Sequence, residues 1–176
     1  MLVGALVSSP AWARPVAEID VGATLGYRHS FVLGAGGIAL GASIGGFIGR
    51  FGLEYETLWS NDHTLKVSER IAGRNDNRFN VMVSVIGRSR FRLVLGGGGS
   101  LGWVKYPGAP SGPGAREPSQ GVQEFLRIDL RMVDSDVSLF YGIRVGASHR
   151  WQPAIVPAPD HAVEVALVIA FGPSID

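Results

Sequence analysis

The sequence contains no cysteine, which excludes disulfide bridges and thiolate metal sites. Charged residues make up 18% of its 176 residues, below the roughly 25% of an ordinary soluble domain. The net charge of +1 is too small to indicate a nucleic-acid partner. Helical patterning is almost absent, whereas the 25 glycines are about twice the usual share. The length fits one domain, and the composition argues against an ordinary soluble enzyme.

The clearest pattern lies in residues 126–132, where four apolar residues alternate with two arginines and one aspartate. A period of two puts the apolar side chains on one face of a β-strand and the charges on the other. A helix would mix the two kinds around its axis. After a polar turn at 134–136, residues 137–147 alternate in the same way. The two segments therefore predict a hairpin with one apolar face and one polar face.

The same alternation recurs along the chain and predicts an all-β fold of eight antiparallel strands. These strands cover residues 16–28, 37–46, 51–59, 78–85, 90–103, 126–132, 137–148 and 162–171. Eight strands can close into an up-and-down barrel without a free edge. One segment permits a second interpretation, because residues 31–49 are uncharged and contain Gly37, Gly41 and Gly45 at the spacing of a membrane-helix contact face.

The connections and the aromatic residues indicate which face points outward. Residues 29–36, 61–77, 105–120 and 149–160 predict long loops at one end, and short turns are predicted at the other end, as in outer-membrane barrels. On the apolar face, aromatic residues fall near both strand ends, which predicts two girdles at lipid–water interfaces. The girdle residues are Tyr27, Trp59, Phe79 and Trp103 at the long-loop end, and Phe51, Phe91 and Phe171 at the short-turn end.

The polar face consists mostly of small residues with scattered charges and has few of the lysines expected on a soluble exterior. The interior of an eight-stranded barrel is just wide enough for side chains. We therefore predict a closed lumen that contains a charge network. Its predicted members are Glu54, Glu56, Arg92, Arg127, Asp129, Arg131 and Arg144. The alternative is a soluble, lipocalin-like barrel with the apolar face inside and a small apolar ligand.

Residues 1–13 have a short apolar run that ends in Ala11-Trp12-Ala13, which is typical of a signal-peptidase site. The basic segment that usually opens a signal peptide is missing. We therefore predict a truncated signal peptide over residues 1–13 and a single barrel domain over residues 14–176.

With eight alternating strands and two aromatic girdles, the chain resembles the small eight-stranded outer-membrane barrels of Gram-negative bacteria, of the OmpA and OmpX kind. The resemblance covers roughly residues 14–172 and is architectural. Its sharpest element is Val165-x-Leu167-x-Ile169-x-Phe171, which resembles the aromatic-ended insertion signal of such proteins, although five residues follow Phe171. The resemblance implies an outer-membrane location, contact with membrane lipid and lipopolysaccharide, insertion by the barrel assembly machinery, and no cofactor.

These observations predict a structural or surface-interaction role, carried by the extracellular loops, with no pore. The competing function is that of a lipid A-modifying hydrolase, because some barrels of this size are deacylases or palmitoyl transferases. His149 and Glu164 flank the last loop, loosely like a deacylase's His-x-Ser followed by Glu. Trp151 occupies the serine position, and strand parity puts His149 and Glu164 on opposite faces. The four histidines share the long-loop end without ligand spacing, so no metal site is predicted.

Overall fold

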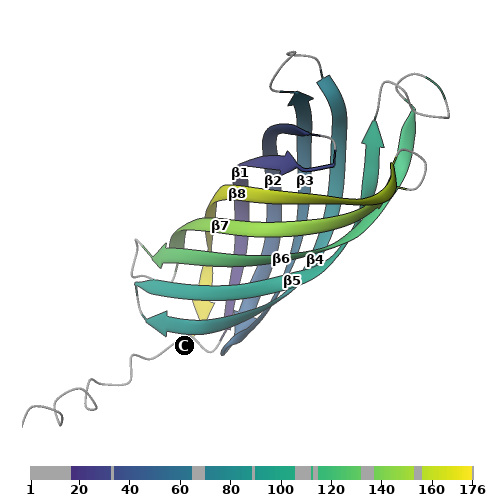
Figure 1. Cartoon of the computed structure of the whole chain (residues 1–176). Coiled ribbons are helices and arrows are strands. Elements are labelled where there is room, and N and C mark those ends of the chain that lie inside the picture. Colours follow the sequence, from purple (N-terminus) through teal and green to yellow (C-terminus); the bar gives the residue numbers. More distant parts are fainter. Residues whose placement is uncertain are drawn as a thin grey trace, which may run out of the picture.

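The structure is a computed structural model, and it describes residues 17–32, 34–64, 70–88, 90–105, 112, 115–131, 137–152 and 156–175. These residues form a closed antiparallel barrel in which each strand pairs with its neighbour in the chain and β8 pairs with β1 (Figure 1). The strands are β1 (Ala17–Ser30), β2 (Ala35–Ile48), β3 (Phe51–Thr64), β4 (Arg70–Arg88), β5 (Phe91–Lys105), β6 (Arg116–Arg131), β7 (Val137–Gln152) and β8 (Val156–Ile175). The predicted fold class is confirmed.

The alternation of the sequence becomes an alternation between the two sides of the wall. Along β8, for example, Leu167 is 57% exposed on the outer face whereas its neighbours Ala166 and Val168 are buried inside. The same holds on β3, where Leu53 points outward and Glu54 inward. The outer wall is therefore apolar and the interior is polar. A soluble barrel with an apolar core would have the two faces exchanged, so that alternative is wrong.

The two ends of the barrel differ. The turn end contains the connections at 49–50 and 89–90 and the end of β8, at the lower left of Figure 1. The loop end contains the connections between β1 and β2, β3 and β4, β5 and β6, and β7 and β8. Strands of 14 to 20 residues are longer than the 9–11 residues that cross a membrane. The strands therefore extend beyond the lipid-facing band.

The boundaries of all four predicted long loops are wrong because the strands continue into them. Residues 61–64 and 70–77 belong to β3 and β4. Residues 31–34 connect β1 to β2, since Ser30 pairs directly with Ala35. Residues 116–120 belong to β6, and residues 149–152 and 156–160 belong to β7 and β8. The prolines that indicated a loop are compatible with strands here. Pro118, for instance, lies in the part of β6 that β7 does not reach, where only one neighbour pairs with it.

The helix interpretation of residues 31–49 is also wrong, because residues 35–48 form β2 and pair with β1 and β3. Within the described residues, no helix has the length and apolar character needed to cross a membrane. The proposed signal peptide, residues 1–13, lies outside the described residues.

The glycine run of β5 provides a matched pair of positions. A Cβ on Gly98 would overlap the carbonyl oxygen of Phe79 on β4, whereas a Cβ on Gly99 would meet only the carbonyl oxygen of Gly121, at 3.9 Å. We expect Gly98→Ala to destabilise the barrel by about 1–3 kcal/mol, the usual cost of overpacking, and Gly99→Ala to have little effect. Urea unfolding of both variants in lipid vesicles checks this. Equal midpoints would contradict the close approach of β4 and β5.

Candidate functional site

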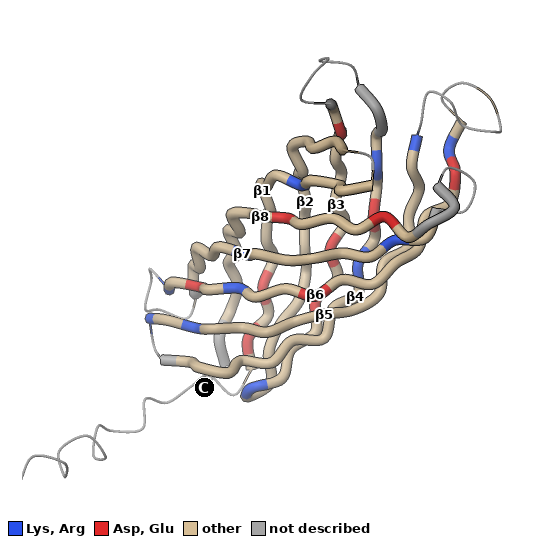
Figure 2. Tube along the Cα trace, viewed as in Figure 1, with Lys and Arg blue, Asp and Glu red and all other residues tan. Residues whose placement is uncertain are grey.

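Many charged side chains are buried in the interior of the barrel. Charged residues recur on the strands between the two ends of the barrel (Figure 2). Their burial is nearly complete: Arg28, Arg74 and Arg150 are each at most 2% exposed. Burying a charge is costly unless opposite charges and hydrogen bonds compensate it. The interior meets this condition through ion pairs that fall into three clusters, which we name by their place in the barrel.

The middle cluster consists of Arg78, Arg144, Glu56 and Glu164, contributed by β4, β7, β3 and β8. Arg78 contacts both carboxylates, with Nη1 3.2 Å from Glu56 Oε2 and Nη2 2.8 Å from Glu164 Oε2. Arg144 Nη2 also contacts both, at 2.7 and 2.9 Å. Thr24 Oγ1 donates a further hydrogen bond to Glu56 Oε1 at 2.8 Å. Two cations and two anions therefore form a balanced square that bridges opposite walls of the barrel.

The turn-end cluster continues this network toward the connections at 49–50 and 89–90. Arg127 Nη1 lies 2.8 Å from Glu54 Oε2, and Arg127 Nε lies 3.0 Å from Asp129 Oδ1. Arg92 contacts Asp129 at 3.1 Å and Glu18 at 2.6 Å. The guanidinium group of Arg92 also lies 4.2 Å from the ring centre of Phe47. This ring belongs to an apolar group beside the cluster that comprises Phe47, Met82, Val94 and Phe125.

The loop-end cluster contains Arg28, Arg74, Asp62 and Asp160. Arg28 Nη1 and Nη2 each lie 3.2 Å from an aspartate, Asp62 and Asp160 respectively. Arg74 contacts the same two carboxylates, at 2.6 and 3.3 Å. Ser30 donates a hydrogen bond to Asp160. Arg150 pairs with Asp76 close by. A second balanced square of charges therefore lies at the loop end of the lumen.

Little free space remains beside the middle cluster. The cavity beside the middle cluster, lined among others by Arg78, Gln123, Phe125 and Glu164, has a volume of about 10 Å³. A single water molecule needs about 10–15 Å³ measured in this way. This cavity therefore has room for one water molecule at most.

The predicted charge network can now be located residue by residue. Glu54, Glu56, Arg92, Arg127, Asp129 and Arg144 all point into the lumen and form ion pairs there. Arg131 is half-buried near the turn end, 5.9 Å from the ring centre of Phe140. Within the network, Arg144 contacts glutamates on β3 and β8, whereas Asp129 contacts Arg92 and Arg127.

Sequence reasoning missed much of the network, above all the loop-end cluster. Arg28 was placed on the polar face without a role. Asp62 and Arg74 were assigned to a connection, and so was Asp160. A signal was available for Asp62 and Arg74. The alternation of inward positions continues on β3 past Trp59 and on β4 before Arg78. For Asp160 no such signal was available, because the prolines around it indicated a loop.

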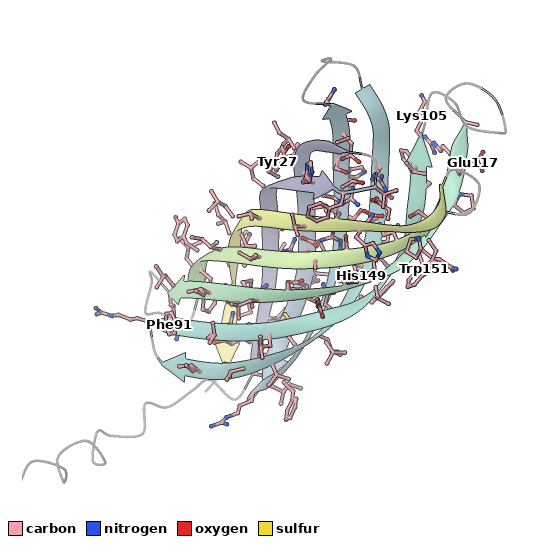
Figure 3. The ribbon with its side chains drawn as sticks, in the orientation of Figure 1. Tyr27, Phe91, Lys105, Glu117, His149 and Trp151 are labelled. Atoms are coloured by element: carbon pink, nitrogen blue, oxygen red, sulfur yellow. The ribbon has the colours of Figure 1, made fainter. Side chains whose placement is uncertain are left out.

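The predicted girdle residues lie on the outer face. Figure 3 shows Tyr27 toward the loop end and Phe91 at the turn end. Trp59 and Trp103 are near the loop ends of β3 and β5, and Phe51 and Phe171 are near the turn ends of β3 and β8.

Phe79 lies near the middle of β4, because this strand begins at Arg70 and not near residue 78. An unpredicted aromatic residue, Trp151, is exposed near the loop end of β7.

The weak catalytic candidates are not brought together. Glu164 pairs across the strands with Gly146 and points inward to Arg78 and Arg144, whereas His149 lies on the outer wall opposite His161. A base and an acid must be within hydrogen-bond reach to act as a unit. Their positions on opposite faces of β7 and β8 rule out this pairing. Within the described residues, no group of three or more His, Asp or Glu side chains is arranged to hold a metal ion.

Comparison with solved structures identifies the class of fold. Neisserial surface protein A (NspA) matches with a TM-score of 0.61 and 14% identity over 90% of this chain and 97% of that chain. The N-terminal β-barrel domain of Pseudomonas aeruginosa OprF matches with a TM-score of 0.47 and 10% identity over 86% and 96%. The attachment invasion locus protein Ail of Yersinia pestis matches with a TM-score of 0.43 and 10% identity over 92% of this chain and 99% of that chain.

No protein-family model matches the sequence. No curated protein matches it either. The likeness to NspA, together with the lipid-exposed apolar wall, shows that the chain has the fold of a small outer-membrane β-barrel. The predicted location, the outer membrane, is the one that belongs to this fold.

Proposed function

We propose that the protein is a closed outer-membrane barrel that serves as a surface scaffold and presents the connections at its loop end to molecules outside the cell. The observation that carries this proposal is the set of ion pairs that fills the lumen from the loop-end cluster to the turn-end cluster. A barrel blocked in this way supports neither solute passage nor a buried active site. Function then rests with the loops that the rigid wall holds. Membrane lipid, lipopolysaccharide and the assembly machinery are the partners that this role requires.

The test of the closed lumen is electrical and chemical. We expect the purified barrel in planar lipid bilayers to show no stable conductance steps, because side chains occupy its interior. Lipid A incubated with the protein should keep all its acyl chains, as measured by mass spectrometry. A general porin and a lipid A deacylase serve as positive controls. Sustained conductance would overturn the closed lumen, and deacylation that is lost in His149→Ala would restore the hydrolase as the function.

The orientation of the scaffold can be tested with single cysteines, since the natural chain has none to give background. Gly112, between β5 and β6 at the loop end, is the outer position. Ser135 lies in the sequence between β6 and β7 and is the position that we expect on the periplasmic side. We expect Gly112→Cys, and not Ser135→Cys, to react with a membrane-impermeant maleimide on intact cells. The reverse pattern would place the loop end in the periplasm and contradict the proposed surface role.

A further inference from the structure

Two of the four histidines meet on the outer wall near the loop end. The register of β7 and β8 places His149 directly opposite His161. Both side chains point outward, because the adjacent residues Arg150 and Asp160 are fully buried in the lumen. The two Nδ1 atoms lie 2.6 Å apart, the ring centres are 4.9 Å apart, and the ring planes meet at 75°. The rings therefore approach nitrogen to nitrogen.

From this geometry we infer that His149 and His161 form a two-histidine site for a divalent transition-metal ion, with Cu²⁺ as the preferred ion. A neutral imidazole presents one lone pair on one of its nitrogens, and imidazole suits copper, nickel and zinc. Here the two Nδ1 atoms share a hydrogen bond at 2.6 Å, and when both rings carry their proton on Nε2 the two Nδ1 lone pairs face the space between the rings. Water completes the coordination, since the pair is accessible on the outer wall. The site is independent of the proposed scaffold role.

The spacing of the two nitrogens favours a tetragonal ion. With metal–nitrogen distances of about 2.0–2.1 Å, two ligands at a right angle lie about 2.9 Å apart, whereas a tetrahedral angle requires about 3.3 Å. The observed 2.6 Å separation is a hydrogen-bond distance and is shorter than both values, so the rings must move apart to admit an ion, and by less for the right angle. Square-planar or tetragonal geometry is typical of Cu²⁺ and Ni²⁺, and Cu²⁺ is bound most tightly in the divalent series. We therefore expect the order copper, nickel, zinc, and no binding of calcium or magnesium at this pair.

The strands beneath the pair hold it in place. On the inner face, Arg150 pairs with Asp76 of β4, and Asp160 pairs with Arg28 of β1. These contacts tie the same two stretches of β7 and β8 to other strands, so the histidines start from a fixed register. Trp151 follows on the outer face and is exposed (Figure 3). Aromatic residues of this kind mark the membrane–water interface, where an aqueous ion can reach the imidazoles.

The experiment is Cu²⁺ titration of the full barrel in detergent micelles, followed by calorimetry and electron paramagnetic resonance. We expect one tight site with hyperfine structure from two nitrogens. His149→Ala and His161→Ala should each lower the affinity at least tenfold and remove the two-nitrogen signal. The matched control is His29→Ala, since His29 lies on the same wall on β1 opposite Val163 and outside the pair. This variant should bind as the natural protein does.

Each outcome decides the question. An unchanged affinity in His161→Ala, or an equal loss in His29→Ala, would overturn the site. So would a spectrum with a single nitrogen ligand in the natural protein. His149→Gln and His161→Gln provide a second pair of variants if an alanine variant does not fold, and folding is checked by circular dichroism before titration. Tighter binding of Zn²⁺ than of Cu²⁺ would overturn the predicted tetragonal geometry.

Discussion

Replacing Arg78 by methionine should lower the stability of the barrel by about 3–5 kcal/mol, the cost of leaving a buried charge without its partner. Arg78 contacts Glu56 at 3.2 Å and Glu164 at 2.8 Å, and its removal leaves two buried carboxylates facing Arg144 alone. Urea midpoints in phospholipid vesicles, followed by tryptophan fluorescence, provide the measurement. Arg50→Met, in the exposed turn between β2 and β3, is the matched control and should change stability by less than about 0.5 kcal/mol.

A second variant separates charge balance from packing. Combining Arg78→Met with Glu164→Gln removes one cation and one anion, so that Arg144 and Glu56 remain as a balanced pair at 2.7 Å. We expect the double variant to recover part of the lost stability, because replacing both members of a buried pair costs less than breaking it. If Arg78→Met unfolds at the same urea concentration as Arg50→Met, the lumen is solvated and its ion pairs contribute little.

Leu167→Arg should prevent stable insertion. Leu167 lies midway along the outward residues of β8, between Val163 and Phe171, and is 57% exposed on the outer wall. An arginine on the lipid face costs about 2–4 kcal/mol at the bilayer midplane and about 0–1 kcal/mol near the interface. We therefore expect Phe171→Arg, near the turn end, to be much milder. Outer-membrane fractionation and urea unfolding in vesicles measure both variants. Equal tolerance at the two positions would show that lipid does not cover the middle of this wall.

The alternation of apolar and polar residues was sufficient to predict the strands, their two faces and the closed barrel, because side-chain direction in a strand depends on parity alone. It was sufficient for β6 and β7, where charges and aliphatic residues alternate without interruption. It failed at the loop end, where prolines and polar residues resemble a loop in composition. The strands continue there because each pairs with at least one neighbouring strand.

The partners of the lumen charges could not be predicted from local patterns. Asp129 has one partner, Arg127, on its own strand and another, Arg92, on β5. Glu164 was considered as a catalytic acid and instead contacts Arg78, 86 positions earlier in the chain. Such contacts depend on the closure and stagger of the whole barrel, and neither quantity is encoded in a single strand. The meeting of His149 and His161 likewise depends on the register of the last hairpin.

The distance along the chain between the lumen partners has a consequence for biogenesis. Arg28 and Asp160 are 132 positions apart, and Arg144 and Glu56 are 88 apart. A nascent sheet that lacks β8 contains the arginines of both squares without two of their four carboxylates. The charges of the two squares balance only when β8 joins the barrel. A chain without β8 would therefore keep most of its outer apolar wall but leave buried arginines of both squares without Asp160 and Glu164.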